Sequence, residues 1–128
     1  MAKLSNLINV NFNRNTIKIQ GVDIPVIFTF KSFPFVEEAY GKSYGAFEKD
    51  LNSMLKKGKV NLGEKEIKLM NALIFSMIRS GGTDTTIAEV ENAIPLADLP
   101  DIFQVAFDLF SNQNFQYEDQ EKIKQEKK

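Results

Sequence analysis

Two residue types that supply much of the polar chemistry of proteins are missing from this sequence. Its 128 residues include no cysteine and no histidine. The lack of cysteine excludes disulfides, thiolate nucleophiles and cysteine-ligated metals. The lack of histidine removes the commonest general base and metal ligand at neutral pH. An enzyme made from this sequence would need serine–lysine pairs, carboxylates or carboxylate-bound metal ions.

Extremes of charge and of hydrophobicity are missing as well. The formal net charge is −1, so there is no large basic field for nucleic acid and no strong acidity. No apolar run approaches the roughly 18 residues that span a bilayer, and "MAKLSNLINV" lacks the pattern of a secretory signal. The hydrophobic content of 43% is ordinary for a globular protein. We expect a soluble, cytoplasmic protein with no cofactor and no nucleic-acid or membrane partner.

Strand-like alternation marks the first thirty residues. Apolar and polar residues alternate in "INVNFNRN", "TIKIQ" and "IPVIFTF", which favours half-buried strands. Gly21 can adopt the positive φ of a turn between the second and third of these segments, and Pro25 indicates that the third strand either lies at an edge or starts there. The apolar members of the alternation are Ile8, Val10, Phe12, Ile17, Ile19, Ile24, Val26, Phe28 and Phe30.

Helical periodicity follows, interrupted by helix-ending residues. Pro34 suits the first turn of a helix that Gly41 ends, and Ser43 can begin the next helix. Residues 64–79 are apolar around most of the helix, which predicts a central position in a core or an oligomer. Thr86 and Glu89 form a predicted capping box, and a last helix runs from about residue 98 to 111.

These patterns predict a mostly α-helical α+β fold. We expect an N-terminal antiparallel β-hairpin or three-strand meander followed by four to five helices. A single domain would cover residues 1–111, and residues 112–128 would form a polar, disordered tail because they are rich in charge and poor in apolar residues.

Candidate catalytic motifs fit structural roles better than chemical ones. The "GKS" of residues 41–43 resembles the end of a phosphate loop, but Glu37 stands where such a loop needs glycine and the preceding segment is helical. Glu37 and Glu38 are adjacent, so they project about 100° apart on a helix and cannot face each other. The acids Asp84, Asp98, Asp101 and Asp108 lack the spacing of a metal-binding loop. We therefore predict no catalytic and no metal-ligating residue.

Aromatic residues near the C-terminus are the candidate partner-binding residues. Aromatic side chains concentrate binding energy at interfaces, although scattered surface aromatics and ordinary packing remain the alternative. The five candidates are Phe103, Phe107 and Phe110 in the last predicted helix and Phe115 and Tyr117 in the predicted tail.

The order of these segments resembles the tail assembly chaperones of long, non-contractile-tailed bacteriophages. The resemblance is carried by "TIKIQGVDIPVIFTF", "SFPFVEEAYGKSYGAFEKDL", "EIKLMNALIFSMIRSGG" and "TDTTIAEVENAI". It covers about residues 15 to 115, with the short acidic-aromatic helix at residues 35–40, the Gly-Lys-Ser turn at 41–43, the central apolar helix at 67–78 and the "T-x-x-E-V" helix at 86–90.

The resemblance implies a non-enzymatic assembly helper in the host bacterial cytoplasm. Such chaperones bind the aggregation-prone tape-measure protein, contact the major tail (tube) protein and are absent from the mature virion. The resemblance also implies a frameshift-extended form of the chain, and the closing "EKK" is compatible with a slippery codon run. An exposed edge strand and an over-apolar helix would favour homo-oligomers, including open helical ones.

Two other interpretations remain open from the sequence. A small phage or mobile-element regulator that inhibits a host protein complex would have the same size, charge and lack of catalytic motifs. A carboxylate-dependent hydrolase or transferase would need a deep polar pocket or a bound metal ion.

Overall fold

The structure is a computed structural model that describes residues 3–10, 14–55 and 63–111. Strands β1 (Arg14–Ile19) and β2 (Val22–Ile27) form one antiparallel hairpin, with Ile17 opposite Ile24. Gln20 and Gly21 connect the strands, and both have positive φ, at 52° and 77°. Two successive positive φ values give a turn whose twist matches that of the strands. The predicted hairpin is confirmed, and the described residues contain no third strand.

Two details of the predicted strands are wrong. Residues 8–10 are not a strand: Ile8 and Val10 are exposed and follow a short helix, α1 (Leu4–Leu7). The described pairing register ends at Arg14 opposite Ile27, where β2 also ends, so β2 does not extend along residues 8–10. Phe12, the third apolar member of that predicted strand, lies outside the described residues.

Phe30 is the second exception, because it is 73% exposed rather than packed with Phe28. A 3-10 turn, η1 (Phe30–Ser32), begins there and ends the period of two. The Thr29 hydroxyl accepts a hydrogen bond from the Lys31 N–H at 3.2 Å, and the Thr29 N–H donates to Ser32 Oγ at 3.1 Å. These hydrogen bonds join residues within three positions of one another and favour a turn. The strand alternation therefore does not continue to Phe30.

Helices α2 (Phe33–Tyr40) and α3 (Tyr44–Leu55) are joined by the "GKS" turn. Gly41 has a φ of 80° and donates its N–H to the Glu37 carbonyl at 2.9 Å, as a left-handed helix cap does. Ser43 Oγ accepts from the Ala46 N–H at 3.2 Å and caps the start of α3. The predicted helix-to-helix turn is confirmed.

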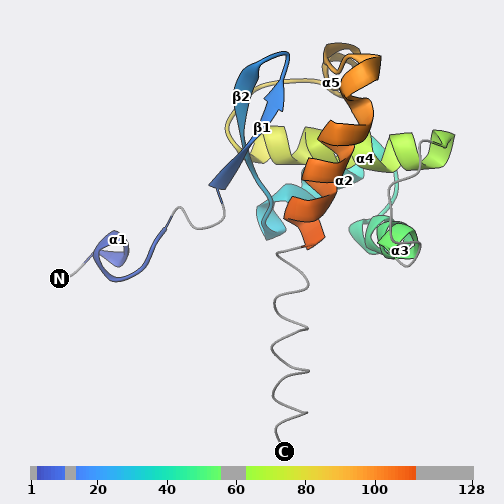
Figure 1. Ribbon diagram of the computed structural model, residues 1–128. Helices are drawn as coiled ribbons and strands as arrows, with labels where there is room; N and C mark the ends of the chain where they lie inside the picture. The colour runs from blue at the N-terminus through green and yellow to red at the C-terminus, as the bar shows by residue number, and fades with distance from the viewer. Residues whose placement is uncertain (1–2, 11–13, 56–62, 112–128) are drawn as a thin grey trace, which may run out of the picture.

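Helix α4 (Glu64–Ser80) is the centre of the fold (Figure 1). Every residue from 69 to 78 is buried, as its nearly all-round apolar sequence predicts. The helix packs against β2, α2, α3 and α5 (Ile87–Ala93). After η2 (Leu96–Asp98), a last helix over residues 99–111 crosses α4 and adds Phe103 and Phe110 to the same hydrophobic core.

Specific local contacts stabilise the end of α4 and the start of α5. The Thr86 hydroxyl accepts the Glu89 N–H at 3.1 Å, so the first half of the predicted capping box is present. The Glu89 carboxylate instead accepts a hydrogen bond from the Thr85 hydroxyl at 2.9 Å. Near the end of α4, the Arg79 guanidinium lies 4.8 Å from the centre of the Phe35 ring and donates to the Thr85 carbonyl at 3.2 Å.

Candidate binding groove

A groove of about 820 Å³ opens between the end of α2, the first two turns of α4 and the start of α5. Helix α4 contributes Glu64, Lys65, Ile67, Lys68 and Asn71 to its lining. All but Lys65 recur at i, i+3, i+4 and i+7, so these four form one stripe along one side of the helix. We refer to these four residues as the α4 stripe.

The groove has an apolar floor. Ala39 from α2, Ile67 from α4 and Ile87 from α5 line it, and each is partly buried and packed against the core. Burying such surface against a partner releases roughly 25 cal/mol per Å² of apolar area. The floor therefore suits an apolar contact rather than a fully hydrated ion.

Two lysine side chains lie beside Tyr40 at one end of the groove. Lys42 Nζ lies 5.7 Å and Lys68 Nζ lies 5.4 Å from the centre of the Tyr40 ring. Cations at this distance are attracted by the negative face of the ring. In the described part of the chain, the only ion pair within 4 Å joins Lys65 to Asp50, so Lys42 and Lys68 have no carboxylate partner at that range.

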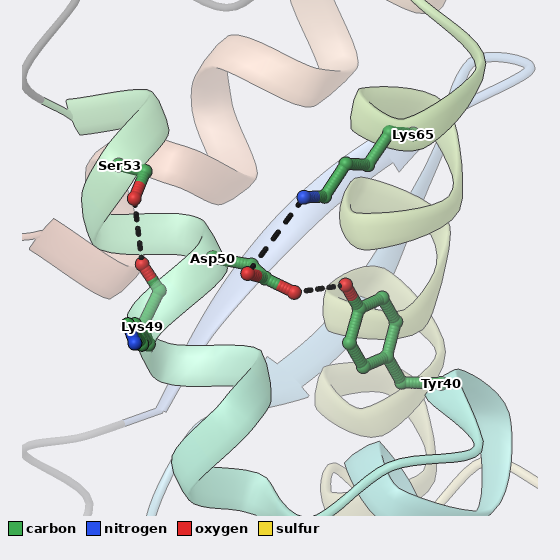
Figure 2. A network of polar contacts seen from close by, with 5 residues as sticks. All are labelled: Tyr40, Lys49, Asp50, Ser53 and Lys65. Carbon is green, nitrogen blue, oxygen red and sulfur yellow. Dashed lines mark hydrogen bonds and ion pairs between the residues drawn. The ribbon is translucent and has the colours of Figure 1, made fainter.

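A polar network fixes this end of the groove (Figure 2). The Tyr40 hydroxyl of α2 donates to Asp50 Oδ2 of α3 at 2.5 Å, and Lys65 Nζ of α4 lies 3.8 Å from Asp50 Oδ1. On α3 itself, the Ser53 hydroxyl donates to the Lys49 carbonyl at 3.1 Å. The network connects three helices, and the Lys65 pair contributes little by itself because Lys65 is exposed.

The network shifts the pKa values of its acidic groups in opposite directions. Burial, followed by the hydrogen bond to Asp50, raises the pKa of Tyr40 to about 12. The hydrogen bond from Tyr40 lowers the pKa of Asp50, and Lys65, Lys42 and Lys49 lower it further, although partial burial opposes them. Tyr40 is therefore a neutral donor and Asp50 an ionised acceptor at neutral pH.

Asn71 is the least satisfied polar side chain of the groove. The residue is only 7% exposed, and its Oδ1 has no hydrogen-bond partner. Ser76, one turn and a half further along α4, is buried too but donates to the Leu73 carbonyl at 2.7 Å. Among described residues, the one other buried side-chain atom without a partner is Ser111 Oγ, at the last described position. A buried acceptor left unpaired costs about 1–3 kcal/mol.

A smaller groove of about 310 Å³ lies between the hairpin turn and the last helix. Ile17, Ile102 and Val105 supply its apolar lining, while Lys18 and Asp101 stand among its polar residues. No polar atom of this lining is both buried and unpaired. It is the smaller of these two grooves.

The predicted partner-binding aromatics do not form a surface in this structure. Phe103, Phe107 and Phe110 are 0%, 7% and 1% exposed, and Phe110 packs edge-on against Phe28 with ring centres 5.4 Å apart. Their helical stripe is filled by the core, so their assignment as partner anchors is corrected to internal packing. Phe115 and Tyr117 lie outside the described residues, as does the predicted tail over residues 112–128.

The acidic residues considered for chemistry form no cluster of three among the described residues. Glu37 and Glu38 are exposed, and a Glu37 carboxylate oxygen accepts the Tyr44 N–H at 2.9 Å, which adds a cap to α3. The described residues contain no group of three or more acids placed to hold a metal ion. Within the same residues, no helix combines the length and the apolar character needed to cross a bilayer.

Sequence reasoning missed the two residues that define the groove, Tyr40 and Asn71. Asn71 did leave a signal, because it is the single amide in the apolar run "LMNALIF" of the central helix. Tyr40 left none, since its hydroxyl partner comes from a different helix. Comparison of this chain with protein-family models, with curated proteins and with solved structures found no match.

Proposed function

We propose that this protein is a tail assembly chaperone of a long, non-contractile-tailed bacteriophage. In this proposal it covers apolar surfaces of the tape-measure protein and contacts tail-tube subunits in the host cytoplasm, without making or breaking covalent bonds. It also associates with a frameshift-extended form of itself and is absent from the finished virion. The observation that carries the proposal is the open α4 stripe between α2 and α5, with its apolar floor.

An open helix face between two other helices supports binding of helical segments. Proteins that recognise amphipathic helices do so in hydrophobic grooves between their own helices. A tape-measure protein is a long helical chain, so it would offer this type of surface many times along its length. Several chaperone copies would then be needed to cover it.

Exposed apolar side chains near the N-terminus support self-association. Leu4, Leu7, Ile8 and Val10 are 60%, 70%, 59% and 52% exposed. Four exposed aliphatic residues within one short segment favour an interaction surface there. Multi-angle light scattering across a concentration series is expected to show a mass that rises above that of the 14.5 kDa monomer.

Co-expression with the long helical tape-measure protein that this proposal names as the partner tests the proposed function. We expect the long protein to be insoluble when expressed alone, and to be soluble and to co-purify when this chain is present. A long protein that stays insoluble with this chain present in excess contradicts the proposal. An enzyme assay is not required for that outcome, since the readout is solubility.

A further inference from the structure

The α4 stripe is an open helix face with helices on both sides of it. Residues 64 to 71 advance by about 10 Å along the helix axis, at about 1.5 Å per residue. Along this length Glu64 and Lys68 are exposed and Ile67 is half-buried, whereas Asn71, the last member of the stripe, is buried like the rest of residues 69–78. A helix of two to three turns laid along the stripe would contact α2 on one side and α5 on the other.

The two lysines at the Tyr40 end indicate the charge of the occupant. Lys42 and Lys68 both place their ammonium groups within 6 Å of one ring centre, and neither has a carboxylate within 4 Å in the described part of the chain. A carboxylate placed between them would be attracted by both. Lys65 differs because Asp50 lies 3.8 Å from it, whereas Lys42 attracts the Asp50 carboxylate only from beyond 4 Å.

The remaining acids of the lining limit how negative the occupant can be. Glu64 and Glu91 also line the groove. A polyanion would be repelled there, whereas a helix with one acid near Tyr40 and neutral residues elsewhere would not. The apolar floor and the volume of about 820 Å³ also suit a helix with aliphatic side chains better than a small inorganic anion.

Asn71 indicates one further feature of the occupant. Asn71 lines the groove, and its Oδ1 is buried and has no hydrogen-bond partner, so we infer that this oxygen is the acceptor for a donor group that enters the groove. A glutamine, asparagine, serine or threonine on the apolar face of a helix would supply the donor. A purely apolar helix would leave the acceptor unpaired, and such a mismatch is penalised strongly.

We propose that this groove binds one amphipathic helix of a partner protein, selected by a carboxylate between Lys42 and Lys68 and by a side-chain donor to Asn71. This inference rests on the proposed function and names the surface that would perform it. The occupant is defined by three features at helical spacing: aliphatic residues over the floor, a central amide or hydroxyl, and an acid at the Tyr40 end.

Three synthetic helical peptides test the inference against the full-length protein. The first carries leucines at i, i+3 and i+7, a central glutamine and one terminal glutamate. The second replaces the glutamate with lysine, and the third replaces the glutamine with leucine. Fluorescence anisotropy is expected to show the tightest binding for the first peptide and roughly tenfold weaker binding for each of the others, a ratio that corresponds to the usual worth of one buried polar contact.

Charge reversal in the protein provides the decisive comparison. The double variant Lys42→Glu/Lys68→Glu is expected to reverse the order and bind the lysine peptide more tightly than the glutamate peptide. Lys18→Glu is the matched control, because Lys18 is exposed and lines the other groove. It should leave the order and the affinities unchanged. Asn71→Leu should abolish the preference for glutamine over leucine while the preference for glutamate persists.

Several results would overturn the inference. They are the absence of saturable binding by all three peptides, equal binding of the glutamate and lysine peptides, or an unchanged order in the double variant. Inorganic phosphate that competes with the first peptide would assign the lysines to a free oxyanion instead. Self-association that the double variant removes, without peptide binding, would assign the groove to a second copy of this chain.

The same variants separate this inference from the proposed function. If the double variant still keeps the long helical protein soluble at the wild-type yield, the groove assignment is wrong and the chaperone proposal stands. If the wild-type chain binds the first peptide as expected but leaves the long protein insoluble, the groove assignment stands and the chaperone proposal is wrong.

Discussion

Replacement of Gly81 by alanine tests how the hairpin packs on the central helix. Gly81 directly follows α4 and has an ordinary φ of −74°, so alanine brings no backbone strain there. A Cβ atom at this position would overlap the Pro25 carbonyl oxygen and lie 2.8 Å from its carbon and 3.0 Å from Val26 Cα. All three are backbone atoms of β2, which cannot rotate away as a side chain can.

The expected cost follows from this overlap. Inserting one carbon into a packed site where backbone must shift destabilises a protein by about 1–3 kcal/mol. For a chain of this size, about 2 kcal/mol lowers the melting midpoint by roughly 6 to 10 °C. Urea unfolding followed by circular dichroism should show the loss as a lower midpoint with an unchanged m-value.

Gly45→Ala is the matched control, because the change of residue is the same and the surroundings differ. Gly45 lies in the first turn of α3, and a Cβ there would meet only Ser43 Oγ, at 4.0 Å. Alanine favours the helix over glycine, so the variant should gain up to about 1 kcal/mol. If Gly81→Ala proves as stable as the wild type while Gly45→Ala behaves as expected, the close approach of β2 to the end of α4 is refuted.

Three further predictions concern the polar contacts. Tyr40→Phe removes the largest cause of the low Asp50 pKa, so NMR titration should show this pKa rising towards its usual value. The same variant should lose about 1 kcal/mol of stability at neutral pH. An unchanged Asp50 titration would contradict the hydrogen bond. The fold raises the pKa of Tyr40 to about 12, so the contribution of the neutral Tyr40 hydroxyl to stability is complete below pH 10 and declines as the pH rises from 10 to 12. Urea midpoints of the wild type should therefore fall between pH 10 and pH 12, and those of Tyr40→Phe should fall less. Thr86→Ala should cost about 1 kcal/mol by removing the cap on the Glu89 N–H, and Thr86→Ser should restore most of it; equal losses in both variants would show that the hydroxyl does not cap α5.

Local signals in the sequence were sufficient for most of the helices and turns. The left-handed conformation of Gly41, the capping by Ser43 and the burial of α4 all follow from interactions within a few residues or from one periodic pattern. Such features depend little on the rest of the fold, so one sequence predicts them.

The features that failed have two kinds of cause: the exposure of Phe30 comes from a local turn, whereas the aromatic assignment and the groove depend on contacts between distant segments. Phe30 has the right parity for the inner face of a strand, but a turn held by Thr29 begins before the strand reaches it. Phe103 and Phe107 were predicted to bind a partner, because the sequence alone does not predict that they join one core cluster with residues of α4 and of the hairpin. The groove was not predicted at all, since it exists only when Tyr40 and Ile87 come to either side of the α4 stripe.

The central proposal is that this protein shields apolar helical surfaces of another protein by binding, with no chemical step. Its most direct test is the light scattering of the denatured long helical protein as it is diluted into buffer with increasing amounts of this chain. The account predicts that scattering falls to the baseline at a fixed stoichiometric ratio, without nucleotide or metal, and that the Lys42→Glu/Lys68→Glu variant is much less effective. Scattering that is unaffected by a large excess of the wild-type chain would contradict the account.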